Sequence, residues 1–181
     1  MSEVSIVFPH QLFQNAEALN KIRPIYLVEE FLFFKKYNYH KQKLAFHRAS
    51  MKSYELNLKS AGYDVNYINT PDPNSDIRNL IQYLFHEGVK TIYLTDPTDN
   101  WLSKRINESA IKCEINIQQF ESPLFINSKE DLASFFRSDK KKFFQTSFYK
   151  SQRKKWKVLI EDNDEPTGGQ WSFDADNRKK Y

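Results

Sequence analysis

Five polar side chains stand where predicted strands end, and their chemical types suit ligand binding. They are His10, Gln11, Glu29, Glu30 and Asp96. An imidazole, an amide and carboxylates close to several phenylalanines favour an uncharged, hydrogen-bonding aromatic ring or a ribityl-like polyol as ligand. We therefore expect a cofactor-binding site formed by these five residues.

The same sequence offers no catalytic or metal-binding motif. With only four glycines, the chain has neither a GxGxxG nor a P-loop cradle for a diphosphate. His40 and His47 are seven residues apart, unlike the i,i+4 pairs that bind zinc on helices, and we expect His47 to be a core residue. Cys113 is the single cysteine and has no neighbouring base. We expect no catalytic residue and no metal site in this chain.

Strands and helices alternate along the chain and would position these side chains. The predicted strands are Ser5–Phe8, Ile25–Glu29, Val65–Ile68, Thr91–Thr95 and Glu114–Phe120. Helical spacing of apolar residues predicts helices between His40 and Gly62, before Gly88, after Asp99 and from Ser128. This order predicts an α/β, Rossmann-like, doubly wound parallel five-stranded sheet with helices on both faces. Ligands of such sheets bind beyond the carboxyl ends of the strands, where the five polar residues stand.

Charge is concentrated in one segment near the end of the chain. Residues 139–157 have a net charge of +7 in a chain whose total is +4, so the other 162 residues are net −3. We expect an α/β domain over 1–140 and, over 141–181, an arm made of a basic helix (roughly 144–160) and a linker. The basic segment suits nucleic-acid phosphates or an acidic surface of another domain, although most such runs are solvated helix faces.

Composition also indicates a compartment. One cysteine, no signal peptide and no apolar run of about 18 residues predict a cytoplasmic protein without a membrane segment.

Two stretches resemble the N-terminal part of the deoxyribodipyrimidine photolyase-related proteins, the group of iron–sulfur bacterial cryptochromes and (6-4) photolyases. They are His40–Ile68 and Phe148–Lys179. In the second stretch the family pattern is matched by Phe148, Tyr149, Pro166, Gly168, Gly169, Trp171, Phe173, Asp174, Asn177 and Arg178, with Lys150 in place of the family's arginine. A weaker likeness begins at VFPHQL and extends over the whole chain.

The resemblance implies an antenna domain that is not an enzyme by itself. In this family the α/β half binds 6,7-dimethyl-8-ribityllumazine, and the matching positions here are His10, Gln11 and Glu29. His10 stands where the family usually has Asp. FAD and a four-cysteine [4Fe–4S] cluster belong to a larger helical domain, which we expect as a partner in cis or in trans.

The function expected from the resemblance is chromophore binding in a protein of light-dependent DNA repair or photoreception, with DNA contacted only by the intact protein. Six residues of the arm would contact the helical domain or nucleic acid; they are Lys150, Arg153, Lys154, Lys155, Trp171 and Arg178. An oligomer is also compatible with the sequence. Two other functions stay open, namely a stand-alone nucleic-acid-binding module using the basic C-terminal segment and a small Rossmann-like nucleotide-processing enzyme.

Overall fold

The computed structural model describes residues 2–172 and divides the chain into two compact units, residues 1–125 and 126–181. Each unit is described by itself. The division expected after residue 140 lies further along the chain, inside the second unit.

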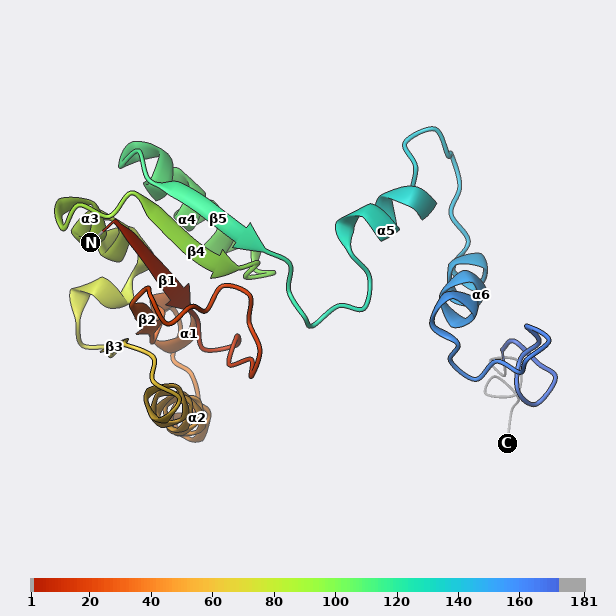
Figure 1. Ribbon diagram of the computed structural model, residues 1–181, viewed down its shortest axis with the longest axis horizontal. Coiled ribbons are helices and arrows are strands. Elements are labelled where there is room, and N and C mark those ends of the chain that lie inside the picture. Colours follow the sequence, from red (N-terminus) through yellow and green to blue (C-terminus); the bar gives the residue numbers. More distant parts are fainter. Residues whose placement is uncertain (1, 173–181) are drawn as a thin grey trace. The chain divides into compact units, whose positions relative to one another are not determined.

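A five-stranded, all-parallel sheet forms the centre of the first unit (Figure 1). Its strands are β1 (Glu3–Val7), β2 (Ile25–Val28), β3 (Val65–Ile68), β4 (Thr91–Thr95) and β5 (Asn116–Phe120). The order β3-β2-β1-β4-β5 places the topological switch at β1, between β2 and β4. The predicted doubly wound parallel sheet is confirmed, because each expected strand is present with small shifts at its ends.

Helices cover both faces of this sheet. They are α1 (Phe31–Phe34), α2 (Lys41–Ser60), α3 (Ile77–His86) and α4 (Asn100–Lys112), with a 3₁₀ turn η1 at Pro73–Ser75. Because side chains alternate along a strand, Val4 and Ile6 pack against α3 and α4, while Val7 on the other face packs with Met51 of α2. Asp76 caps α3 and Asp99 caps α4, where the sequence left Ser75 and Thr98 as alternatives. α1 was not predicted, because four residues are too few to establish a helical period.

The second unit contains two helices and a compact loop. Ser128 and Asp131 form a capping box at α5 (Lys129–Phe135), as their spacing predicts. α6 (Gln145–Trp156) is shorter than the expected basic helix because Lys157 adopts the left-handed conformation, with φ of 53°. The chain then folds back through a bridge between Ile160 and Pro166.

Within residues 2–172, every helix is too short or too polar to traverse a lipid bilayer.

Candidate functional site

The five polar residues lie at the carboxyl ends of β1, β2 and β4, but they do not surround a single cavity. His10 lines a hollow at the surface. The other four, Gln11, Glu29, Glu30 and Asp96, bind the ends of strands and helices to one another, as described below. Of the five expected site residues, one therefore faces a hollow, and four make hydrogen bonds that hold the carboxyl edge of the sheet together.

A hollow of about 260 Å³ opens beside the switch point, between the loop after β1 and the first half of α2. It is lined by Pro9, His10, Leu12, Phe13, Phe46, His47 and Ser50. The lining is mainly apolar, with two imidazoles and one hydroxyl as the polar groups. The hollow therefore suits a flat aromatic ring, with the two imidazoles and the hydroxyl as its hydrogen-bonding groups.

The environment of His10 fixes its protonation pattern. Nε2 lies 2.8 Å from the carbonyl oxygen of Pro97, which only accepts, so Nε2 carries the proton and donates it. Nδ1 is then an acceptor, and it is buried without a hydrogen-bond partner. Burial lowers the pKa of His10, although the Pro97 contact and the charge of Asp99 act in the opposite direction. His10 is thus a neutral side chain with one free acceptor atom.

His47 faces the same hollow from α2 and packs edge-on against Phe34, with 6.0 Å between ring centres. It is half-buried, so its predicted place in the core is wrong. Burial, followed by the charges of Lys43 and His10, lowers its pKa. The two histidines bring uncharged imidazoles to one hollow, an arrangement the sequence did not indicate.

Gln11 and Asp96 join the loops after β1 and β4. The buried amide of Gln11 donates from Nε2 to the carbonyl oxygens of Thr95 and Asp96, each 3.0 Å away. The carboxylate of Asp96 accepts from the amide of Thr98, which has a positive φ of 53°. Both residues therefore shape the loop whose carbonyl at Pro97 holds His10.

Glu29 is fully buried and engaged on both carboxylate oxygens. The guanidinium of Arg48 binds it in a bidentate manner, with both N–O distances 2.6 Å. Tyr67 donates from its hydroxyl at 2.7 Å, and Thr70 donates from both its amide and its hydroxyl. Burial alone would raise the pKa of Glu29, but these hydrogen bonds outweigh it and hold the pKa at about 2. Glu29 joins α2 to β2 and β3, and its oxygens are already committed.

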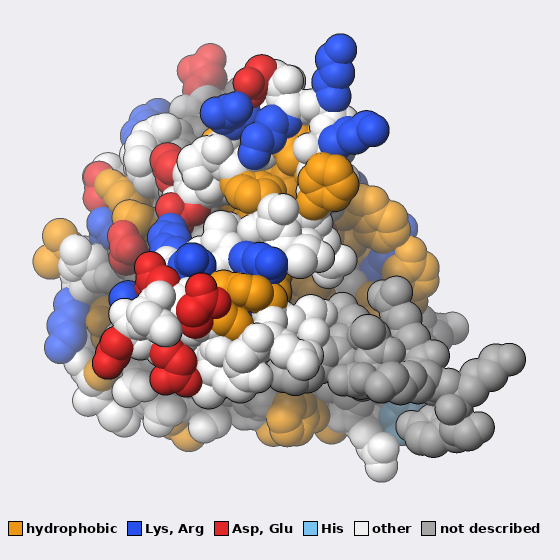
Figure 2. Space-filling model, turned by 90° about the vertical axis from the view of Figure 1, so that its right-hand side faces the viewer, with side chains coloured by type: hydrophobic (Ala, Val, Ile, Leu, Met, Phe, Trp, Pro, Cys, Tyr) orange, Lys and Arg blue, Asp and Glu red, His pale blue; other side chains and the backbone are white. Residues whose placement is uncertain are grey.

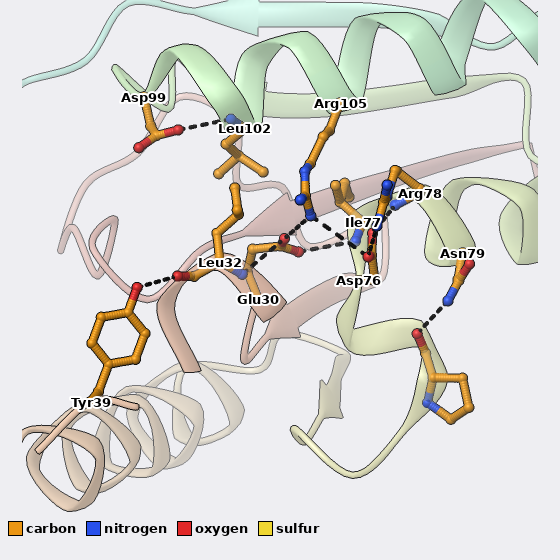
Figure 3. Close-up of polar contacts among 11 residues, drawn as sticks. Glu30, Leu32, Tyr39, Asp76, Ile77, Arg78, Asn79, Asp99, Leu102 and Arg105 are labelled. Atoms are coloured by element: carbon orange, nitrogen blue, oxygen red, sulfur yellow. Dashed lines mark hydrogen bonds and ion pairs between the residues drawn. The ribbon is translucent and has the colours of Figure 1, made fainter. Parts of the chain in front are cut away.

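Glu30, the next residue, occupies a different environment (Figure 3). Its carboxylate accepts from the amides of Leu32 and Ile77, at 3.4 and 3.0 Å, so it caps α1 and meets the first residue of α3. Arg105 of α4 approaches to 4.0 Å, and it also lies 3.6 Å from Asp76. Burial and the charge of Asp76 raise the pKa of Glu30 to about 7, against the effect of the two amides and Arg105.

Sequence reasoning missed the partners of Glu29. Arg48, Tyr67 and Thr70 come from α2, β3 and the turn after β3. No local motif links them to Glu29, since the contacts arise only when α2 packs on the sheet. The same packing brings Phe46 and Ser50 to the hollow.

Arg153 is the centre of the second unit rather than an exposed contact residue. It is buried, and its guanidinium donates to the carbonyl oxygens of Val158, Leu159 and Trp171. It also lies 5.3 Å from the centre of the Trp171 ring. Arg153 therefore closes the loop after α6, and its guanidinium is not available to phosphates.

The remaining arm residues surround Trp171 or bind α5. The ammonium groups of Lys150 and Lys154 each lie 5.4 Å from the Trp171 ring centre. Lys155 forms an ion pair of 2.6 Å with Asp131. Gly168 and Gly169, with φ of 82° and 75°, allow the sharp turn that brings Trp171 back to α6. Arg178 lies outside the described residues.

The cysteine content of the chain does not fit an iron–sulfur cluster. Cys113 is the single cysteine of the sequence and is buried, whereas such a cluster takes four thiolates. Among residues 2–172, no group of three or more His, Cys, Asp or Glu side chains could hold a metal ion.

Comparisons with known proteins point to one family. The model of the deoxyribodipyrimidine photo-lyase-related proteins matches residues 5–181. The chain is 33% identical over 189 residues to uncharacterized protein R852 of Acanthamoeba polyphaga mimivirus, covering 99% of this chain and 95% of that protein. It is 24% identical over 189 residues to the (6-4) photolyase of Agrobacterium fabrum, covering 99% of this chain but only 36% of that relative.

The two adjacent glutamates should respond oppositely to pH. The lowered pKa of Glu29 means that its contribution to stability is present above about pH 4.5 and is lost as pH falls toward 2. The raised pKa of Glu30 means that its contribution is full below about pH 4.5 and is lost as pH rises through 7. We expect Glu29→Gln to lower the free energy of unfolding by about 1–3 kcal/mol at pH 8, since it removes the charge that pairs with Arg48 and turns one acceptor oxygen into an NH2 group that faces donors.

Glu30→Gln should destabilise the protein less at pH 8 than at pH 5, because at pH 8 it removes a buried charge, whereas at both pH values the amide keeps an acceptor for only one of the two N–H groups. Thermal unfolding followed by circular dichroism at pH 5 and pH 8 measures both effects. A Glu30→Gln variant that is destabilised more at pH 8 than at pH 5 would contradict the assigned environment.

Arg153→Lys should loosen the loop after α6, because one ammonium group cannot satisfy three carbonyl oxygens. We expect faster hydrogen exchange at the amides of Thr167 and Gly169, which close this loop, by about tenfold or more. Lys142→Gln, at an exposed lysine of the same unit, is the matched control and should leave exchange unchanged. Equal exchange in both variants would show that Arg153 does not hold the loop.

Proposed function

Because the chain belongs to the deoxyribodipyrimidine photo-lyase-related protein family, we propose that it is the pigment-binding α/β part of a light-responsive protein. The pigment is a planar heteroaromatic molecule of the ribityllumazine class, seated in the hollow beside His10. When bound, it supplies absorption of light and transfer of the excitation energy to a flavin. The flavin and the chemistry at it, whether DNA repair or photoreception, belong to a helical partner domain.

The free acceptor of His10 is the observation that carries this proposal. Where the family usually has an acidic residue, this chain has a neutral imidazole whose Nδ1 only accepts. A buried acceptor without a partner costs about 1–3 kcal/mol. Because Nδ1 is buried, an N–H group of a pteridine-type ring can reach it only if the His10 side chain or its loop shifts as the pigment binds, and the new hydrogen bond then removes that cost. His10 thus keeps the acceptor role of a carboxylate without its charge.

The rest of the hollow fits the same class of ligand. Its volume of about 260 Å³ is close to the lower limit of ligand pockets, which suits a bicyclic ring with the ribityl chain at the rim near Ser50. Phe13 and Phe46 provide apolar surfaces for the ring. Glu29 acts indirectly: by holding Arg48 it fixes the helix that carries Phe46 and His47.

The test is a titration of the purified chain with 6,7-dimethyl-8-ribityllumazine, followed by the absorption band and fluorescence of the pigment. We expect a red shift or quenching with micromolar affinity or better. His10→Leu should weaken binding at least tenfold, the factor that corresponds to about 1.4 kcal/mol. His10→Asp should retain binding, because it restores the acceptor that the family usually has.

His86→Leu is the matched control, since His86 is exposed on α3 away from the hollow-lining residues. Its affinity should equal that of the unmodified chain. Absence of any spectral change at high protein concentration, or equal losses in the two leucine variants, would refute the proposal.

A further inference from the structure

A second basic region lies in the first unit and was concealed by the overall charge balance. Residues 31–54 contain six Lys and Arg and no Asp or Glu. Residues 1–125 contain 14 basic and 14 acidic side chains, so the rest of this unit is net −6. The net charge of −3 outside residues 139–157 thus includes a locally basic stretch.

Four lysines of this region are exposed and are not neutralised by a carboxylate among the described residues. They are Lys35, Lys36, Lys41 and Lys43. Among residues 2–172 none of them forms an ion pair, whereas Arg48 and Lys52 of the same region bind Glu29 and Glu55. Lys41 and Lys43 also stand in the first turn of α2, where the helix dipole disfavours positive charge. Lys41 and Lys43 are thus two like charges kept at a helix end that disfavours them.

Aromatic rings are exposed among these lysines. Tyr37 is 56% exposed and Trp101, from the start of α4, is 54% exposed. The ammonium of Lys36 lies 5.9 Å from the ring centre of Tyr37 and 6.0 Å from that of Trp101, so the two rings flank one cation. Lys43 lies 4.4 Å from the ring centre of Tyr39. Exposed hydrophobic side chains beside Lys and Arg are not special to this region, because the face shown in Figure 2, the right-hand side of Figure 1, also has them.

We propose that this basic aromatic surface, formed by Lys35, Lys36, Tyr37, Lys41, Lys43 and Trp101, binds single-stranded nucleic acid. The lysines neutralise phosphates, and Tyr37 and Trp101 stack on bases that a single strand leaves unpaired. An anionic membrane or an acidic peptide would satisfy the lysines but would leave the exposed ring faces without a role. The surface is formed by residues other than those that line the hollow, so binding does not depend on the pigment.

The test uses the full chain and fluorescein-labelled oligothymidylate and oligouridylate of about 20 nucleotides, with anisotropy measured at about 50 and 200 mM salt. We expect binding that weakens steeply with salt. Replacing Lys36, Lys41 and Lys43 by Gln should lower the affinity at least tenfold and reduce the log–log salt slope by about 2, which is 0.7 for each lost phosphate contact.

The matched control replaces Lys90, Lys104 and Lys112 by Gln, which removes the same charge from exposed positions elsewhere in the first unit. It should change the affinity less than threefold. Replacing Lys140, Lys141 and Lys142 by Gln tests the basic arm in the same way. A loss confined to the arm variant would overturn the assignment to the α1–α2 region.

Trp101→Leu separates stacking from charge. It should weaken single-strand binding about fivefold or more and leave the salt slope unchanged, because it removes a ring and no cation. Trp156→Leu on α6 is its control. A duplex of equal length should bind more weakly than the single strand.

Comparable affinity for the two oligonucleotides, or preference for either, supports the proposal. A preference indicates whether the natural ligand is DNA or RNA. No binding at low salt, duplex binding that is insensitive to Trp101→Leu, or binding only to phosphatidylserine vesicles would overturn it.

Discussion

Two carboxylates buried side by side at the end of β2 hold the functional edge of this protein together. The charge of Glu29 is paired with Arg48, and its oxygens also accept hydrogen bonds from the hydroxyls of Tyr67 and Thr70. These contacts fix α2 against the sheet. Glu30 accepts from the amides that begin α1 and α3. Burying such groups is costly unless every oxygen finds a partner. Because the partners come from both faces of the sheet, these two residues tie α1, α2 and α3 to the edge of the sheet.

The hollow beside His10 is a consequence of that arrangement. α2 carries Phe46, His47 and Ser50 to one side of it, and the loop after β1 supplies the other side. Gln11 and the carbonyl of Pro97 hold the β1 and β4 loops, which orients the imidazole of His10. A site at the switch point of a parallel sheet is expected on topological grounds. Here the polar groups that line the hollow are mainly the imidazoles of His10 and His47, whereas Glu29 and Glu30 hold the helices against the sheet.

Much of the fold follows from the sequence, because apolar runs bounded by Pro, Gly and Asp reveal strands and caps locally. Asp76, Asp99 and the Ser128–Asp131 pair are examples in which the signal lies within a few residues. The site was predicted only in part. The position of Glu29 at the carboxyl end of β2 was predicted correctly. Its partners were not, because Arg48 and Thr70 lie 19 and 41 residues away in the sequence. Arg153 was misjudged for the same reason, since an arginine that binds carbonyl oxygens looks in sequence like one that binds phosphate.

The central claim is that the hollow at this edge holds a flat pigment against His10. A ¹H–¹⁵N spectrum of the imidazole side chains, recorded with and without 6,7-dimethyl-8-ribityllumazine, tests it most directly. The chain has four histidines, each of which reports on a separate place. The account predicts that the signals of His10 and His47 shift while those of His40 and His86 stay unchanged. Unchanged signals from His10 and His47, or equal shifts of all four, would contradict it.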